Sequence, residues 1–329
     1  MSAVPTLAEI EAAARIVHAH MPPTPQYCWP LLCEALGTEV WVKHENQTPV
    51  GAFKIRGGLV HFACLAERGV LPSGVISATR GNHGQSVGFA ARLHGIPATI
   101  VVPHGNSREK NAAMRAFGVE LIEHGEDFQA SREHAAELAD ARGLRMVASF
   151  HEDLVTGVAT YALELLRAVA GVDVVYVPIG LGSGICGMLA VRDALGLTTE
   201  VVGVVSAHAP AYARSFAAGE AVDAPALTAI ADGMACRTPE PEALARIGRG
   251  VSRVVEVTDD EVRAAMRLLF ETTHNVAEGA GAAAVAAASQ ERAGNRGRRV
   301  AVVLSGGNVD REVFAEVLGG DGTPREPEG

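Results

Sequence analysis

Short apolar segments alternate with longer amphipathic segments along most of this chain. Several of the apolar segments lead into glycine-rich turns, and the clearest apolar segments are 75–78, 98–102, 174–178, 200–206 and 300–304. Strands that alternate with helices in this way pair in parallel through right-handed crossovers. Ligands of such open sheets bind beyond the C-terminal ends of the strands. We therefore predict an α/β protein with two open, twisted, mostly parallel sheets, flanking helices and a ligand between the sheets.

These segments fall into two series, which predict two domains in a chain of 329 residues. Residues 56–149 form the predicted small domain, and residues 1–55 with 150–318 form the predicted large, ligand-binding domain. Residues 319–329 are rich in Gly, Pro and Glu and are predicted to be disordered. Helices are predicted at 7–19, 57–68, 85–94, 109–117, 128–141, 157–170, 185–195, 259–274 and 279–290, and further strands at 39–45, 119–123, 145–148 and 254–257.

Charge and composition exclude several classes of protein. The formal net charge is −10 and no basic run is present, which argues against a nucleic-acid partner. No apolar run reaches membrane-spanning length and no signal-peptide pattern opens the chain, so we predict no membrane partner and a cytoplasmic location. The five cysteines include no CxxC pair, which favours reduced thiols over a disulfide framework or structural zinc.

Lysine is nearly absent from this chain. Of the 28 basic residues only Lys43, Lys54 and Lys110 are lysines, and Lys54 stands between Phe53 and a pair of glycines. Arginine keeps its proton at every accessible pH, whereas a partly buried lysine can lose it and act as a base or a Schiff-base nucleophile. An ordinary surface lysine on a loop is the alternative for this residue taken alone.

Three glycine-rich turns follow predicted strands and could share one ligand. Gly180-Leu181-Gly182-Ser183-Gly184 opens a predicted helix, where backbone N–H groups and the helix dipole favour an anion such as phosphate. Residues 182–187 also match the GxGxxG dinucleotide pattern, but the next strand lacks the carboxylate that would bind a ribose. A phosphate cradle is therefore favoured over a nicotinamide site, and a turn that needs glycine only for its dihedral angles remains open.

The other two turns are less specific. Residues 79–85 (Thr-Arg-Gly-Asn-His-Gly-Gln) either use the Asn82 side chain to brace the turn or arrange donors around an anionic oxygen. Residues 305–308 (Ser-Gly-Gly-Asn) place Ser305 either as a helix cap or as a neutral hydroxyl facing a ligand nitrogen.

Taken together, these residues resemble the fold-type II pyridoxal-phosphate enzymes, which have the fold of the tryptophan synthase β subunit. The resemblance is to the threonine/serine dehydratase and serine racemase family, and it spans residues 10–315 in family order. Residues 51–58 are similar to the family's Ser-Phe-Lys-x-Arg-Gly-Ala signature, 81–85 to its asparagine loop and 305–308 to its ring-nitrogen turn. Residues 231–233 and 278–281 have family counterparts as well.

The resemblance implies a role for each matching residue. Lys54 would bind pyridoxal 5'-phosphate covalently and act as the catalytic base, with Phe53 beside it. Asn82 would bond the phenolic oxygen of the ring, and Ser305 would face its nitrogen. The phosphate would bind to Gly180, Leu181, Gly182, Ser183 and Gly184, and the amino-acid substrate to Thr79, Arg80, Gly81 and His83. Homodimerisation is expected by resemblance only.

The reaction expected from the resemblance is the conversion of a β-hydroxy-L-amino acid, threonine or serine by default, to a 2-oxo acid and ammonia. Arg80 stands where serine racemases carry a serine, and arginine is a poor general acid or base, which argues against racemisation. Arg80 leaves open a bulkier or acidic substrate such as 3-hydroxyaspartate, phenylserine or a hydroxylated diamino acid, or else an outward ion pair with a surface carboxylate. Amino-acid racemisation, β-replacement, a nicotinamide oxidoreductase and a non-enzymatic binding protein are the other readings.

The same comparison bears on metal binding. Thr228, four residues before Asp232, offers no carboxylate that could complete a divalent site around that aspartate. We therefore predict no metal site from these residues.

Overall fold

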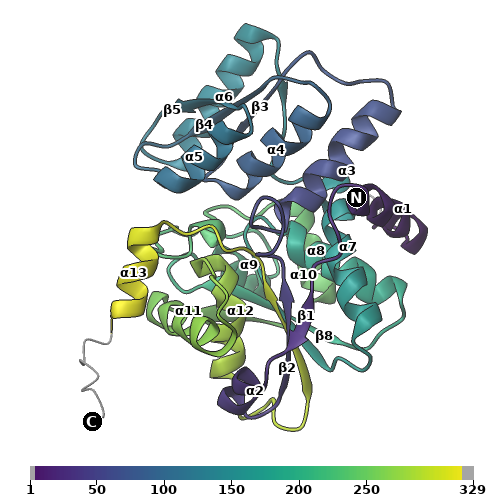
Figure 1. Ribbon diagram of the computed structural model, residues 1–329, viewed down its shortest axis with the longest axis vertical. Helices are drawn as coiled ribbons and strands as arrows, with labels where there is room; N and C mark the ends of the chain where they lie inside the picture. The colour runs from purple at the N-terminus through teal and green to yellow at the C-terminus, as the bar shows by residue number, and fades with distance from the viewer. Residues whose placement is uncertain (1–3, 321–329) are drawn as a thin grey trace.

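The computed structural model describes residues 4–320 as two sheets, each flanked by helices (Figure 1). The larger sheet has the strand order β1-β2-β10-β7-β8-β9. Only β1, at one edge, runs antiparallel to its neighbour. Its strands are β1 (Gln26–Cys28), β2 (Glu39–His44), β7 (Val174–Pro178), β8 (Glu200–Ser206), β9 (Arg253–Val257) and β10 (Arg299–Leu304).

The smaller sheet is parallel throughout and has the order β5-β4-β3-β6. Its strands are β3 (Val75–Ala78), β4 (Ala98–Val102), β5 (Glu120–Glu123) and β6 (Arg145–Met146). Helices α4 (Asn82–Leu93), α5 (Arg108–Ala116) and α6 (Phe128–Arg142) accompany this sheet in the upper part of Figure 1. The prediction of an α/β fold with two mostly parallel sheets is confirmed.

Helices cover both faces of the larger sheet, because its strands are apolar on both sides. Val175 and Val177 of β7 pack with one helix layer, while Val174 and Tyr176 of the same strand pack with the opposite layer. The first layer includes α1 (Leu7–His18), α7 (Glu152–Ala168), α8 (Ser183–Ala194), α9 (Ala211–Ala218) and α10 (Pro241–Gly250). The second includes α2 (Pro30–Leu36), α11 (Asp259–Thr273), α12 (Gly279–Gln290) and α13 (Arg311–Gly319).

Helix α3 (Lys54–Glu67) differs from its prediction. It begins at Lys54 rather than at residue 57, so the glycine pair lies inside the helix. A Cβ atom on Gly57 would meet α7 at Leu154, and one on Gly58 would meet α4 at Ser86. The glycines therefore permit α3 to pack closely against both helices, and Lys54 stands in its first turn.

Several other elements escaped the prediction, namely β1, α2, α9, α10 and α13. Pro30 and Pro241 occupy the first position of α2 and α10, where proline suits a helix start. Gly319 ends α13, and residues 321–329 of the predicted tail lie outside the described residues. The limits assigned to the two domains remain a prediction. Within residues 4–320 no helix has the length and apolar character needed to span a membrane.

Candidate active site

A cavity of about 1140 Å³ lies beyond the C-terminal ends of β3, β7 and β10. Its walls come from both sheets, as expected for a ligand held between them. Every residue that the sequence analysis assigned to cofactor or substrate lines this cavity: Phe53, Lys54, Thr79, Arg80, Gly81, Asn82, His83, Gly180, Leu181, Gly182, Ser183, Gly184 and Ser305. The tertiary structure therefore gathers four distant segments around one space.

Lys54 projects into this cavity from the first turn of α3. Its Nζ atom donates a hydrogen bond to Ser183 Oγ at 3.1 Å and lies 4.9 Å from the centre of the Phe53 ring. No carboxylate among residues 4–320 forms an ion pair with this amine. Removal from bulk water therefore disfavours the charged form and lowers the pKa of Lys54 to about 8. The amine can exchange a proton near neutral pH.

The turn Gly180–Gly184 connects β7 to α8 directly opposite Lys54. Gly182 adopts φ +97°, and a Cβ atom there would lie 2.5 Å from Cβ of Ala243. Only glycine fits this backbone conformation. The residues that follow Gly182 form the first turn of α8, where the backbone N–H groups have no partner within the helix. Tyr212 supports the turn by donating its hydroxyl proton to the Leu181 carbonyl at 3.0 Å. Backbone N–H groups at such a helix N-terminus favour an anion, so the turn has the geometry of an anion cradle.

The turn between β3 and α4 forms a second wall. Thr79 accepts a hydrogen bond from the Gly81 amide at 3.0 Å, which fixes the bend. Arg80 is partly buried and forms no hydrogen bond or ion pair with residues 4–320, so the alternative of an outward pair with a surface carboxylate is not observed there. His83 is buried, and burial together with the charge of Lys54 lowers its pKa to about 3. Its Nε2 atom has no hydrogen-bond partner, so His83 is a neutral ring with an open polar atom.

Asn82 belongs to a polar network that the sequence analysis did not assemble. Its amide nitrogen donates to Glu278 Oε1 at 2.6 Å, and its carbonyl oxygen accepts from Asn308 at 2.8 Å. Lys110 Nζ lies 2.7 Å from Asp232 and 3.1 Å from Glu278. Burial opposes the charge of Lys110, but the two carboxylates outweigh it and raise the pKa of the amine. The rarity of lysine in the chain was the signal that could have marked Lys110.

Glu278 is the most buried acid of this network. Burial, together with the neighbouring Asp232 charge, raises the pKa of Glu278, although Lys110 and Asn82 oppose that shift. The sequence analysis had placed Glu278 only within a matching family segment.

Ser305 follows the last residue of β10 and is buried beneath the Lys54 segment. Its hydroxyl donates to the carbonyl of Ala280 at 3.3 Å, and its own carbonyl accepts from the Phe53 amide at 3.1 Å. Ala52 and Gly306 form a bridge beside this contact. The strand end therefore holds the Lys54 segment and presents a neutral hydroxyl to the cavity.

These groups fit pyridoxal phosphate. An aldehyde needs an amine that can lose its proton, and no carboxylate within residues 4–320 pairs with Lys54 to prevent this. A phosphate needs backbone donors without side-chain obstruction, which the cradle at Gly182 provides. A pyridine nitrogen can face the uncharged hydroxyl of Ser305.

Comparison with known proteins agrees with this chemistry. Residues 17–306 match the family model described as pyridoxal-phosphate dependent enzyme. The chain belongs to this family. It is 32% identical to an L-threonine ammonia-lyase of Thermotoga maritima, over 95% of this chain and 78% of that protein. It is 29% identical to an L-threo-3-hydroxyaspartate ammonia-lyase of Saccharomyces cerevisiae, over 96% and 97% of the two chains. The crystal structure of a pyridoxal 5'-phosphate-dependent aspartate racemase superposes with a TM-score of 0.89 at 28% identity, over 95% of this chain and 99% of the other.

Several predictions are thereby confirmed. The family, the cofactor and the assignment as a pyridoxal-phosphate-dependent lyase agree with the family model and the relatives. The same match decides against a nicotinamide oxidoreductase. The roles of the individual site residues, the homodimer and the cytoplasmic location stay predictions.

Proposed function

We propose that this lyase converts β-hydroxy-L-amino acids to 2-oxo acids and ammonia, with L-threonine and L-serine as substrates. The observation that carries the proposal is the unpaired, partly buried amine of Lys54, with a pKa of about 8, beside the anion cradle. The related L-threonine ammonia-lyases support the choice of substrate.

Each wall of the cavity has a binding role in this proposal. Gly180, Leu181, Gly182, Ser183 and Gly184 hold the phosphate, and Phe53 flanks the ring. Asn82 would donate the second hydrogen of its amide nitrogen to the phenolic oxygen of the ring, because Glu278 accepts only the first. Ser305 would offer an uncharged hydroxyl to the pyridine nitrogen. Thr79, Arg80 and Gly81 of the β3–α4 turn, together with His83 in the first turn of α4, bind the substrate.

Lys54 then moves the proton that starts the reaction. Bound pyridoxal phosphate withdraws electrons from the α-carbon of the substrate and so acidifies its proton. The neutral amine of Lys54 takes that proton, and a pKa of about 8 leaves more of the amine neutral at a given pH than the usual lysine value would. With the uncharged Ser305 beside it, the bound cofactor would withdraw electrons less strongly than with a carboxylate partner, which would favour prompt loss of the β-hydroxyl. The hydroxyl would leave as water with the proton that Lys54 took up. The unsaturated amine that is released hydrolyses to the oxo acid and ammonia.

An acidic β-hydroxy amino acid such as 3-hydroxyaspartate is a second candidate substrate. Arg80 and Arg132 both line the cavity, and neither forms an ion pair within residues 4–320. Arg80 is partly buried and Arg132 is exposed, so Arg80 is the guanidinium that would gain most from a second carboxylate on the substrate. A yeast relative carries the name L-threo-3-hydroxyaspartate ammonia-lyase. Racemisation is less well supported, because Arg80 offers no readily exchangeable proton.

The test is the visible spectrum of the purified protein, followed by oxo-acid detection with L-serine, L-threonine, L-threo-3-hydroxyaspartate and L-threo-phenylserine. Lysine-bound cofactor absorbs at roughly 410–420 nm. We expect this absorbance band, together with oxo acid formed from serine or threonine. If the band appears but none of the four amino acids yields oxo acid, dehydration is refuted. If no band appears after reconstitution with pyridoxal phosphate, the role of Lys54 is refuted.

Arg80→Ala separates the two substrate candidates. If the guanidinium binds a second carboxylate, kcat/KM for hydroxyaspartate should fall at least about tenfold relative to that for serine. Arg115→Ala is the control, because Arg115 pairs with Glu123 on the surface.

A further inference from the structure

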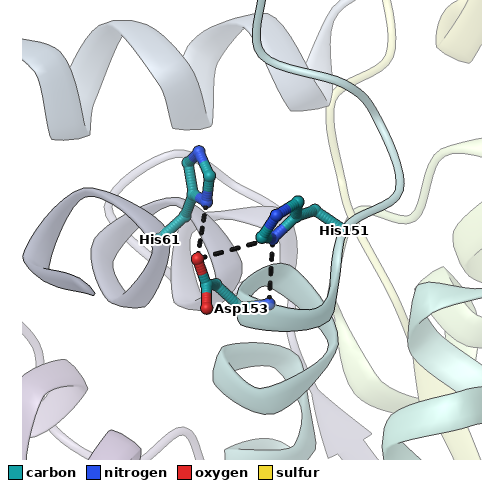
Figure 2. Close-up of side chains that lie close together, drawn as sticks. All are labelled: His61, His151 and Asp153. Carbon is teal, nitrogen blue, oxygen red and sulfur yellow. Dashed lines mark hydrogen bonds and ion pairs between the residues drawn. The ribbon is translucent and has the colours of Figure 1, made fainter. Parts of the chain in front are cut away.

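A second group of polar side chains gathers where α3 meets the start of α7 (Figure 2). His61 comes from α3, His151 immediately precedes α7, and Asp153 lies in the first turn of α7. His61 and Asp153 are buried, while His151 is exposed. None of the three lines the active-site cavity, and the proposed reaction uses none of them.

Two imidazole nitrogens point toward one carboxylate oxygen. The Nδ1 atom of His61 lies 3.1 Å from Oδ2 of Asp153, and Nδ1 of His151 lies 3.4 Å from the same oxygen. The ligand atoms of the three residues all lie within 4.8 Å of one another. Tetrahedral zinc, with bonds of about 2.0–2.2 Å, places its ligand atoms about 3.3–3.5 Å apart. These side chains therefore need only small movements to close around one such ion.

The hydrogen bonds at His151 leave an unfavourable contact. The Asp153 amide donates to Nδ1 of His151 at 3.1 Å, so this nitrogen carries a lone pair and no proton. Its neighbour at 3.4 Å, Oδ2 of Asp153, is an acceptor as well. A cation bound between His151 Nδ1 and Asp153 Oδ2 would be attracted to both atoms and so remove their repulsion. It would also replace the hydrogen bond from the Asp153 amide to His151 Nδ1 that now caps α7.

Arg68 supplies positive charge to this cluster. Its guanidinium donates to both carboxylate oxygens of Asp153, at 2.9 and 3.2 Å. The Arg68 side chain is 55% exposed, and an ion pair so open to water contributes little to stability. A divalent ion can therefore displace Arg68 at small cost.

We propose that His61, His151 and Asp153 bind one divalent transition-metal ion, with zinc as the best match, at the junction of α3 and α7. Two imidazoles and one carboxylate suit zinc, whereas magnesium and calcium prefer oxygen ligands throughout. Ser149 and Phe150 directly precede His151 and line the active-site cavity. A bound ion would hold this wall of the cavity against α3. The proposal does not depend on which amino acid the enzyme dehydrates.

Calorimetric titration of the cofactor-loaded enzyme, first dialysed against a chelator, tests the site. We expect one Zn²⁺ per chain from ZnCl₂ and no binding from MgCl₂. His151→Ala removes an exposed ligand, so it should weaken zinc binding at least about tenfold without changing the circular dichroism spectrum. Arg68→Ala removes the competing cation, so it should bind zinc more tightly than the wild-type enzyme. Cys33→Ser is the matched control and should bind zinc as the wild type does.

Three results would overturn the proposal. One is the absence of zinc uptake by the wild-type enzyme. Another is unchanged zinc affinity in both His151→Ala and Arg68→Ala. The third is a loss of binding in Cys33→Ser, which would move the ion to the thiols of Cys28 and Cys33, whose Sγ atoms lie 3.4 Å apart.

Discussion

Two basic residues in the first turn of α3 have opposite surroundings. Arg56 is fully buried, and its guanidinium donates to the carboxylates of Glu45 and Glu164 over 2.6–2.9 Å. Lys43 Nζ adds a fourth charge 2.6 Å from Glu164. Lys54 has one hydroxyl partner, at Ser183, and no carboxylate partner within residues 4–320.

The difference between the two sites is one of protonation. Burial by itself would raise the pKa of Glu164, but Arg56 and Lys43 outweigh burial and hold that pKa at about 2. Paired charges of this kind keep one protonation state across the physiological range and hold α3 in place. An unpaired amine beside a cavity can change its protonation state, as catalysis requires. The same helix turn thus carries a charge-paired guanidinium and an amine with no carboxylate partner within residues 4–320, and four experiments test that contrast.

The largest effect is expected from Lys54→Ala. Loss of the base and of the covalent attachment point should lower kcat by about 10³-fold or more. The thermal unfolding temperature should stay close to that of the wild type, because the substitution removes a poorly solvated amine that has no ion-pair partner within residues 4–320. Steady-state kinetics and thermal unfolding measure the two parts. A variant that keeps both activity and the absorbance band would end the assignment of Lys54.

Arg56→Met should mainly lower stability, whereas Lys54→Ala should mainly lower activity. Two buried carboxylates lose their main partner, which should lower the free energy of unfolding by about 3–5 kcal/mol. Denaturant titration measures the loss. Arg142→Met is the control, since Arg142 pairs with Glu120 in an exposed position and should cost less than about 1 kcal/mol. Equal losses of unfolding free energy in the two variants would show that the buried Arg56 cluster does not stabilise the fold more than an exposed ion pair does.

The pH dependence of cofactor attachment tests the state of Lys54 directly. Only the neutral amine attacks an aldehyde, and the pKa of Lys54 is lowered to about 8. The rate of pyridoxal-phosphate uptake by apoenzyme should therefore rise about fifty-fold from pH 6 to pH 8 and level off above that. Stopped-flow absorbance measures it. A rise that continues to pH 10 would indicate an ordinary, solvated lysine.

The smallest effect is expected from Ser183→Ala. The variant loses the 3.1 Å hydrogen bond from Lys54 and one hydroxyl of the phosphate cradle. A single hydrogen bond contributes about 1 kcal/mol, so cofactor affinity should fall about fivefold while the fold is kept. Fluorescence titration of apoenzyme measures the affinity. An unchanged value would mean that backbone groups alone hold the anion.

Much of the fold followed from local patterns. The apolar segments at β3, β4, β7, β8 and β10 were each predicted at or near their observed limits, since buried strands are continuous apolar runs. The three-residue strand β1 was missed, because its only partner is β2 and it carries no alternation of its own. Helix α3 begins three residues before its predicted start at residue 57, and its two glycines pack against α7 and α4 inside the helix, a contact that a sequence does not display.

The candidate site shows the same limit. Its glycine turns and Lys54 could be read in order along the chain, because each turn needs particular backbone angles. Lys110 could not be placed, since its partners Asp232 and Glu278 lie far away in sequence. The sequence also could not show that Arg80 lacks an ion pair among the described residues, because side-chain contacts depend on the tertiary structure.

The α/β class, the glycine-rich turns that line the cavity and the position of Lys54 beside them follow from the sequence alone, because strand periodicity and turn geometry are local properties. The tertiary structure decided which charges are paired. Arg56 meets Glu164, and His61 meets Asp153, only because α3 packs against α7. Pairing across such distances depends on the packing of whole helices, and it sets both the pKa of each group and the side chains that can share an ion.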